Sequence, residues 1–538
     1  MPVFIFVSAS AVQAAPPPDI FHVSPTGVND ASRAGSESEP WRTINYALSR
    51  AEVGSGDVIV VNSAGIDGNG DYVEVVTVDK SVKIRANSSD PSQPVVRPSN
   101  ASFSVFIVTA DGVEISGLRI YGSEARAAIR LNNVSGCLIE GNSLGGPDES
   151  KRNYFGVWVD HSSQNVVRNN TCQYNKIGID LYYSSANIIY NNSLQMNSES
   201  NINFLYSHAN LILGNTLLDS SGGGSGLHLE VGWQQNIISG NSVEGNGTGV
   251  ELGSSTSTRL GGIITANRFL DNTVGLYLPA NALNHFFFLN HFENDTNVDS
   301  AASEYPLSAW GPLFYQFSGR YFRVPLGNYY SDYAGSDSNG DGIGETSYGG
   351  AGYLDHYPLV EQIVSYKLFG WNLGPTGLST TLNDEDIGGP GKVLTLAAHA
   401  KAIFSTAKPF GEFSAVFPGS SSGTQPAIWN GWLTFASPPA ADHSVSITFG
   451  SSKGYPSSFE PSSASADISG DGTNYIFFFT ATPGAFRVQR GRHLAVCLEN
   501  MADTDLQIMV GGAACMFYAP AGSHPYSPLS PLLLLLGG

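Results

Sequence analysis

The sequence has few of the residues that form disulfide frameworks or bind soft metal ions. Its 538 residues include four cysteines and five methionines, and no Cys-x-x-Cys pair or zinc-type Cys/His spacing occurs. Copper ions prefer thiolate, thioether or clustered imidazole ligands, so we expect no copper site. Cys497 and Cys515 are candidates for one disulfide, whereas Cys137 and Cys172 are expected to be small buried residues.

Basic residues are also scarce. The chain has 26 Lys and Arg against 46 Asp and Glu, which gives a formal net charge of -20. This imbalance excludes nucleic acid, an anionic membrane or polyphosphate as the main partner. It fits a soluble extracellular protein, or a protein that uses cations.

No apolar run is long enough to cross a bilayer. The tail 521–538 ends in SPLSPLLLLLGG, which we interpret as a truncated anchor, a sorting tail or a frayed end. Residues 1–15 combine a short apolar stretch with small residues and are typical of an export signal, although a basic start is missing. A misassigned start is the alternative. We therefore expect a secreted, periplasmic or cell-surface protein.

Helical periodicity is missing from residues 102–295, where a short unit repeats instead. Apolar segments such as NVVR and NIIY precede asparagines that recur every 22 to 28 residues, at Asn142, Asn170, Asn192, Asn215, Asn241, Asn267 and Asn290. Strands this short form no sheet alone, but stacked units pair each strand with its counterpart about 4.8 Å away. The sequence thus predicts an all-β chain whose main body is a parallel β-solenoid.

Both ends of the repeat differ from its middle. WRTINYALSRAEV places Ile44, Ala47, Leu48 and Ala51 on one helical face, which predicts a helix that caps the solenoid. With the strands after it, this stretch resembles pectin-lyase-like right-handed parallel β-helices, which implies that fold for residues 19–300. Residues 301–365 are expected to close the solenoid, and 366–520 alternate like an antiparallel β-sandwich.

One outer wall of the solenoid carries an unusual mixture of side chains. Counted from the glycine that opens a unit, offsets one and three are apolar, so offsets two and four point outward. Aromatic rings stack on sugars while polar groups bind hydroxyls, so we expect a glycan groove. Its predicted substrate-binding residues are Trp158, Tyr183, Asn203, Tyr206, Trp233 and Tyr277. Alternatively, these aromatics are merely good strand formers.

Carboxylates on the same wall have the spacing of an acid–base pair. Asp160 with Asp180, and Glu230 with Glu251, differ by two residues and one coil, which is roughly 8 Å. Inverting glycosidases use a similar separation. For a lyase or epimerase acting on uronates, the candidate acids and bases are His161, Tyr182 and His228, and neutralisation requires a bound cation or Arg168. Catalysis and a non-catalytic role both stay open.

A calcium-type loop lies in the closing segment. Asp337, Asn339 and Asp341 recur at every second residue, followed by Ile343, whose carbonyl is a candidate ligand, and Glu345. Hard cations such as Ca²⁺ prefer such oxygen ligands. In EF-hand order the twelfth position falls on Tyr348, so the predicted affinity is weak, unless Asp332 or Asp355 folds back as a ligand, and the predicted role is structural.

This loop, joined to an Asn-rich repeat, resembles NosD-like proteins over about residues 100–360. That resemblance implies an exported β-helix of a family often labelled copper-binding. The preferred function is recognition of an extracellular polysaccharide or glycan, with or without hydrolysis, elimination or epimerisation. A structural or adhesive protein attached to the cell surface and a metal-maturation accessory are the alternatives.

Overall fold

The computed structural model describes residues 18–362, except 64–69, 231–235, 255–261, 283–284, 303–304, 310–312 and 319, together with separate segments between residues 367 and 518. The predicted export signal, the apolar tail, Trp233 and Cys515 lie outside the described residues. No helix in the described part of the chain is long and apolar enough to span a membrane.

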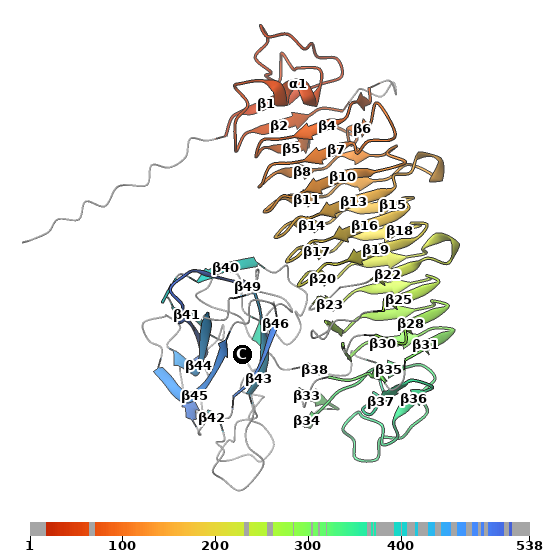
Figure 1. The fold of residues 1–538 in the computed structure, drawn as a ribbon, viewed down its shortest axis with the longest axis vertical. Helices are drawn as coiled ribbons and strands as arrows, with labels where there is room; N and C mark the ends of the chain where they lie inside the picture. The colour runs from red at the N-terminus through yellow and green to blue at the C-terminus, as the bar shows by residue number, and fades with distance from the viewer. Residues whose placement is uncertain are drawn as a thin grey trace, which may run out of the picture.

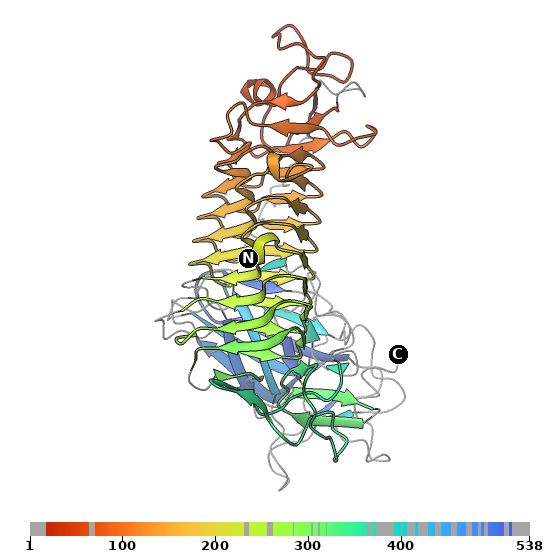
Figure 2. The same ribbon diagram turned by 90° about the vertical axis from the view of Figure 1, so that its right-hand side faces the viewer.

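The main body is a right-handed parallel β-helix, as predicted, in which three sheets run along one axis (Figures 1 and 2). Sheet A contains β1 (Ile20–Val23), β2 (Val58–Val61), β5 (Lys83–Ala86), β8 (Glu114–Ser116), β11 (Leu138–Glu140), β14 (Val166–Arg168), β17 (Ile188–Tyr190), β20 (Leu211–Leu213), β23 (Ile237–Ser239), β26 (Ile263–Thr265) and β29 (Phe286–Phe288).

Sheets B and C complete each coil. Sheet B contains β3 (Tyr72–Val73), β6 (Val95–Arg97), β9 (Arg119–Ile120), β12 (Ser143–Leu144), β15 (Thr171–Gln173), β18 (Ser193–Gln195), β21 (Thr216–Leu218), β24 (Ser242–Glu244), β27 (Arg268–Leu270), β30 (His291–Glu293) and β35 (Tyr329–Tyr330). Sheet C contains β4 (Val76–Val78), β7 (Phe106–Val108), β10 (Ala127–Asn132), β13 (Phe155–Asp160), β16 (Ile177–Tyr182), β19 (Ser200–Leu205), β22 (Ser225–Leu229), β25 (Thr248–Leu252), β28 (Val274–Leu278) and β31 (Thr296–Ser300).

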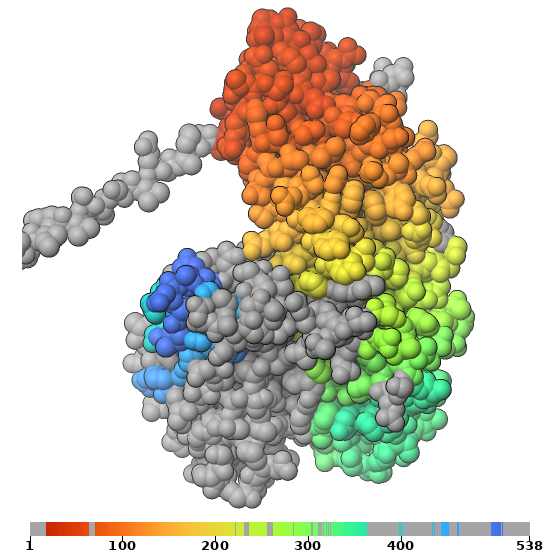
Figure 3. Space-filling model, in the orientation of Figure 1, coloured from red at the N-terminus to blue at the C-terminus, as the bar shows by residue number. Residues whose placement is uncertain are grey.

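The coils stack in the register that the repeat predicts. Val157 pairs with Ile179, and Asp160 pairs with Tyr182. The side chains at offsets one and three are buried in one continuous core, namely Val157, Val159, Ile179, Leu181, Ile202, Phe204, Leu227, Leu229, Val250, Leu252, Leu276 and Leu278. Because successive side chains of a strand alternate between its faces, the residues between them face outward. The space-filling view shows these coils following one another in chain order along the axis (Figure 3).

The helix α1 (Ile44–Ser49) packs against β1, β2 and β4 near the start of the β-helix (Figure 1). The Thr43 side chain caps its N-terminus, and Ile44, Ala47 and Leu48 are buried. The extension of this face to Ala51 is wrong, because the helix ends at Ser49 and Ala51 is exposed in the following turn.

Buried asparagines form hydrogen-bonded ladders at the turns. In the predicted ladder, each side-chain oxygen after that of Asn142 accepts hydrogen bonds from the backbone and side-chain nitrogens of the asparagine one coil earlier, as Asn192 does from Asn170 at 2.9 and 3.0 Å. The oxygen of Asn142 accepts from the Leu118 backbone. A second ladder contains Asn165, Asn187, Asn210 and Asn236, and a third contains Asn153, Asn175 and Asn197. These side chains satisfy buried backbone groups that no strand partner reaches.

The closing segment continues both the ladder and the core. Asn290 donates to Asn328, whose backbone nitrogen donates in turn to the buried Asp355 carboxylate at 2.8 Å. In the core, Tyr330 stacks between Phe292 and Tyr348, at ring-centroid distances of 5.5 and 3.8 Å. The local strands are β32 (Tyr305–Pro306), β33 (Leu313–Phe317), β34 (Arg320–Val324), β36 (Tyr348–Gly350) and β37 (Tyr353–Asp355).

The described strands after residue 366 pair antiparallel, and β38 pairs with β33 of the closing segment. Their packing as a sandwich stays a prediction. They are β38 (Lys367–Leu368), β39 (Trp371–Asn372), β40 (Lys392–Leu396), β41 (Lys401–Ser405), β42 (Ala415–Phe417), β43 (Trp429–Phe435), β44 (Ser444–Ser452), β45 (Glu460–Ser469), β46 (Ile476–Ala481), β47 (Phe486–Val488), β48 (His493–Asn500), β49 (Leu506–Val510) and β50 (Met516–Tyr518).

Replacing one ladder amide tests how much the ladder stabilises the fold. Asn192→Ala removes the acceptor of the Asn170 backbone N–H and one of the acceptors of its Nδ2, which still donates to Ile139 and Arg168. The variant also removes the donor to the Val167 carbonyl. We expect the free energy of unfolding, measured with urea, to fall by about 2–4 kcal/mol. The control is Asn191→Gly, which keeps the left-handed backbone (φ 51°) and removes an exposed side chain. Equal stability of the two variants would contradict the role of the ladder.

Candidate functional site

An outward column of side chains crosses sheet C from coil to coil. Strand register aligns the six predicted residues at offset two and adds one at each end, so the outer column is Arg130, Trp158, Asp180, Asn203, His228, Glu251, Tyr277 and Asp299. Asp180 and Asn203 are buried within it, whereas Asp299 is exposed. Chemically different side chains therefore occupy the same strand position on successive coils.

An aromatic ladder lies at the end of the same strands. His161, Tyr183 and Tyr206 each follow a strand of sheet C, and their rings stack at centroid distances of 5.1 and 4.7 Å. Tyr183 and Tyr206 are 45% and 40% exposed. All three residues have left-handed backbones, with φ of 47°, 47° and 50°, a conformation that costs a non-glycine residue about 1–2 kcal/mol. The same strained bend in three coils aligns the rings.

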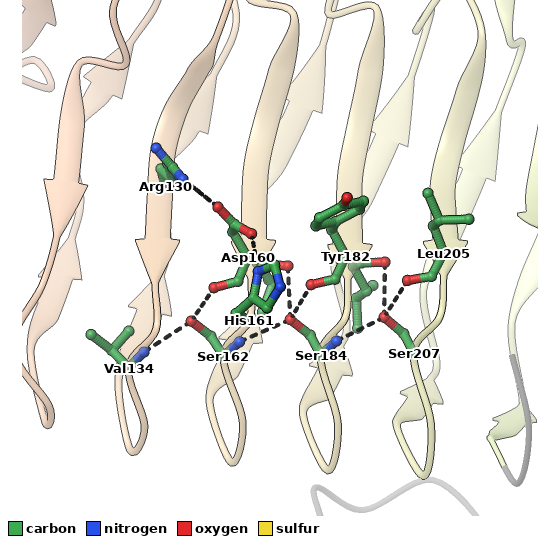
Figure 4. Close-up of polar contacts among 11 residues, drawn as sticks. Arg130, Val134, Asp160, His161, Ser162, Tyr182, Ser184, Leu205 and Ser207 are labelled. Atoms are coloured by element: carbon green, nitrogen blue, oxygen red, sulfur yellow. Dashed lines mark hydrogen bonds and ion pairs between the residues drawn. The ribbon is translucent and has the colours of Figure 1, made fainter. Parts of the chain in front are cut away.

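A buried serine ladder holds this bend (Figure 4). The hydroxyl of Ser184 donates to the carbonyl of Tyr182 and accepts from the backbone nitrogen of Ser162, at 2.9 and 3.0 Å. Ser162 and Ser207 make the corresponding contacts in the neighbouring coils. These bonds fix the backbone directly after each aromatic residue, so the orientation of the rings depends on the turn beneath them.

Arg130, which sequence analysis missed, engages Asp160. Its Nε donates to Oδ2 of Asp160 at 3.0 Å, and its Nη2 makes a close ion pair with the same oxygen (Figure 4). Nδ1 of His161 lies 2.7 Å from the other oxygen, Oδ1. The guanidinium also lies over the Trp158 ring, with Cζ 4.3 Å from its centroid. Both Asp160 oxygens are therefore occupied.

The sequence does contain a signal for Arg130. It occupies offset two of a unit that opens with Ala128 in place of glycine, so a search for glycine-opened units starts one coil too late. Arg168, the predicted neutralising residue, belongs to sheet A and forms a pair with Glu140 at 3.0 Å. The idea that Arg168 reaches this wall is therefore wrong.

Asp180 is the buried acid of the wall. Its Oδ1 accepts a hydrogen bond from Nδ2 of Asn203 at 2.7 Å. Burial is the main cause that raises the pKa of Asp180 to about 7; the hydrogen bond from Asn203 lowers this pKa, and the negative charges of Glu230 and Asp160 raise it. A carboxyl group with this pKa is partly protonated near neutral pH, so it can donate a proton to a bound molecule.

Two coils further along, a histidine lies between two glutamates. Nδ1 of His228 is 3.8 Å from Glu230, and its Nε2 is 4.0 Å from Glu251. Glu251 also accepts a hydrogen bond from the Ser225 hydroxyl at 2.6 Å. This group is separate from the Arg130–Asp160–His161 group, and Asp180 lies between them in the column.

Two polar atoms beside Asp180 have no hydrogen-bond partner. They are Nε1 of Trp158 and Oδ1 of Asn203, and both are buried. In the column these residues occupy the coils immediately before and after Asp180. An unpaired buried donor or acceptor costs about 1–3 kcal/mol, so this part of the wall favours a ligand with matching polar groups.

The remaining predicted wall residues differ in how close they lie to these groups. Tyr182 contacts His161 edge-on, with the ring centroids 5.5 Å apart. Tyr277 is in the outer column, next to Glu251. Thus Tyr182 lies beside the aromatic ladder, whereas Tyr277 lies two coils beyond His228 in the column.

The calcium-type loop is organised by its own carboxylates. Oδ1 of Asp337 accepts from the Gly340 backbone at 2.7 Å, and Oδ2 accepts from Gly342 at 2.7 Å. Glu345 instead accepts from the backbone of Ser338 at 2.7 Å. Among the described residues, no group of three His, Cys, Asp or Glu side chains is arranged to hold a metal ion, so calcium binding stays a prediction.

Comparison with solved structures gives several distant matches. The chain is similar to pectate lyase Pel9A (17% identity, TM-score 0.42), covering 54% of this chain and 78% of that one. An alginate lyase from Paenibacillus sp. str. FPU-7 has 15% identity and a TM-score of 0.34 over 49% and 91%. The periplasmic alginate epimerase AlgG has 15% identity and a TM-score of 0.26 over 47% and 72%. Comparison with curated proteins gives no match.

A family model described as periplasmic copper-binding protein (NosD) matches residues 66–335, which is half of the chain. Copper does not fit the donors that the structure describes. Cys137 and Cys172 are buried, which raises their thiol pKa to about 11 and about 12, and the described residues contain no three-residue metal cluster. The matched residues span the β-helix from β3 to β35. The chain therefore belongs to the NosD family.

Proposed function

We propose that this protein binds a polysaccharide along the outer wall of sheet C. The observation that carries the proposal is the exposed aromatic ladder of His161, Tyr183 and Tyr206 directly beside the polar outer column. Exposed apolar surface with polar groups at its border is typical of interaction sites. Tyrosine combines an apolar ring with a hydroxyl, which suits it to the mixed surface of a sugar.

Hydrolysis is the reaction that these side chains support best. Asp180 retains a proton near neutral pH and is suited to protonate a glycosidic oxygen, while a second carboxylate of the wall takes a proton from the attacking water. Elimination or epimerisation of a uronate needs a free cation to neutralise its carboxylate. Arg130 is already bound to Asp160, so these reactions have less support.

We also propose that binding takes place outside the cytoplasm. The matching family is described as periplasmic. The excess of acidic over basic residues suits a secreted or surface-exposed protein that works without nucleic acid.

Removing the aromatic ladder tests the proposed groove. A glycan array identifies a ligand, and calorimetry then compares the wild type with Tyr183→Ala/Tyr206→Ala. We expect about 5- to 150-fold weaker binding, because each of the two aromatic contacts contributes about 0.5–1.5 kcal/mol. The control is Phe103→Ala, which removes a 52% exposed ring that precedes β7. Unchanged affinity in the double variant, or no glycan bound by the wild type, would refute the proposal.

Asp180 predicts a pH dependence of stability. Between its ordinary pKa of 3.8 and its folded pKa of about 7, the native state keeps a proton that the unfolded state has lost. Stability must therefore fall as pH rises through this window and then level off. We expect Asp180→Asn to be more stable than the wild type by about 2–4 kcal/mol at about pH 8, and the difference to shrink at about pH 4.

Urea titrations across this pH range measure the difference. Asp299→Asn is the matched control, because Asp299 occupies the same outer column and is exposed. A pH-independent difference between Asp180→Asn and the wild type would contradict the raised pKa. If Asp299→Asn gave a similar pH-dependent increase in the free energy of unfolding, the change in net charge would explain the effect, and not the burial of Asp180.

We further propose that Asp337, Asn339, Asp341, Ile343 and Glu345 bind Ca²⁺ weakly, with a Kd of about 10⁻⁴–10⁻³ M. Their alternating oxygen ligands and the bend at Gly342 support this proposal. Calorimetry with millimolar Ca²⁺ should give heat that disappears in Asp341→Ala and persists in Asp295→Ala, which removes an exposed carboxylate elsewhere. No heat with the wild type would rule out the site.

A further inference from the structure

The wall of sheet C is strongly unbalanced in charge. Its strands contain a single Lys or Arg among the described residues, Arg130. The acidic side chains of these strands are Asp160, Asp180, Glu251 and Asp299, of which Asp180 is partly protonated near neutral pH. Directly beside the strands, Glu230 follows β22, Arg126 precedes β10, and Lys176 precedes β16 and pairs with Glu199. A bound molecule therefore meets mainly carboxylates.

The single arginine is unable to offset this charge for a ligand. Its guanidinium binds Asp160 through two nitrogens and covers the face of Trp158. An incoming uronate would have to displace Asp160 from Arg130, which would leave the Asp160 carboxylate buried without its cation. Removing one partner of a buried ion pair is strongly unfavourable.

The two glutamates remain available to a ligand. The side chains of Glu230 and Glu251 are 36% and 38% exposed, and His228 lies between them without a hydrogen bond to either. Even a protonated His228 supplies one positive charge against two glutamates. This part of the wall therefore attracts cations and repels anions.

One unpaired acceptor atom belongs to Asn203, the residue that donates to Asp180. Oδ1 of Asn203 is buried without a partner, in a residue that is only 4% exposed. Its coil lies between those of Asp180 and His228. Carboxylate and amide oxygens accept hydrogen bonds, and an ammonium group donates three.

From this arrangement we propose that the ligand is a glycan with free amino groups, such as a glucosamine polymer, and that the wall discriminates against uronates. This inference rests on the proposed glycan-binding function and narrows it to one chemical class. The protonated amine binds Glu230, Glu251 and the free oxygen of Asn203, while the sugar ring lies beside the aromatic ladder.

A matched pair of ligands tests the inference. Oligomers of glucosamine and of N-acetylglucosamine share a backbone and differ only in whether the nitrogen is charged. Calorimetry at an acidic pH that protonates the free amines should show at least about tenfold tighter binding of the glucosamine oligomer, and the preference should weaken as salt is added. Oligogalacturonate should give no binding.

Two variants separate a specific site from general attraction to an acidic protein. Glu230→Gln/Glu251→Gln should lose most of the preference for the amine. The control Glu37→Gln/Glu39→Gln changes the net charge by the same amount at exposed residues near the N-terminus, and it should retain the preference for the amine. Equal losses in both variants would overturn the inference.

The outcomes also distinguish this inference from the function on which it rests. If the acetylated oligomer or oligogalacturonate binds as tightly as the glucosamine oligomer or more tightly, the amine preference is overturned. If that binding is also lost in Tyr183→Ala/Tyr206→Ala, the proposed groove still stands. No binding of any oligosaccharide would overturn both.

Discussion

Each coil of this protein has to place its backbone and its buried amides directly over those of the next coil. The turns carry this constraint, because their backbone groups are buried and have no strand partner of their own. Asparagine ladders supply the missing acceptors, and the longest reaches Asp355 in the closing segment. Close stacking also explains the glycines before the wall, since a Cβ at Gly178 would lie 2.5 Å from the backbone oxygen of Asn201.

The wall of sheet C depends on this stacking of coils, but its outward side chains do not repeat from coil to coil. Inward positions repeat because every coil must fill the same core, whereas outward positions tolerate change. The strained backbone at His161, Tyr183 and Tyr206 is stabilised by the serine ladder beneath it, and it aligns three exposed rings. Rigid turns thus orient side chains that contribute little to folding.

Burial separates acids that look alike in the sequence. Asp160 is held by Arg130 and His161, whereas Asp180 has one hydrogen-bond donor, Asn203, among the described contacts and a raised pKa. Glu230 and Glu251 stay exposed beside them. The wall therefore combines an ion-paired acid, a proton-retaining acid and two partly exposed acids, which is the basis of both its proposed chemistry and its proposed preference for cations.

The sequence by itself determined the coil, its register and which residues face outward, because these follow from a local pattern of apolar residues and asparagines. It also placed Tyr183 and Tyr206 on the wall. Only the tertiary structure decided that Arg130 binds Asp160, that Arg168 belongs to another sheet, and that Asp180 is buried. Arg130 and Asp160 lie 30 residues apart, and their contact depends on side-chain directions across two coils that no repeat pattern specifies.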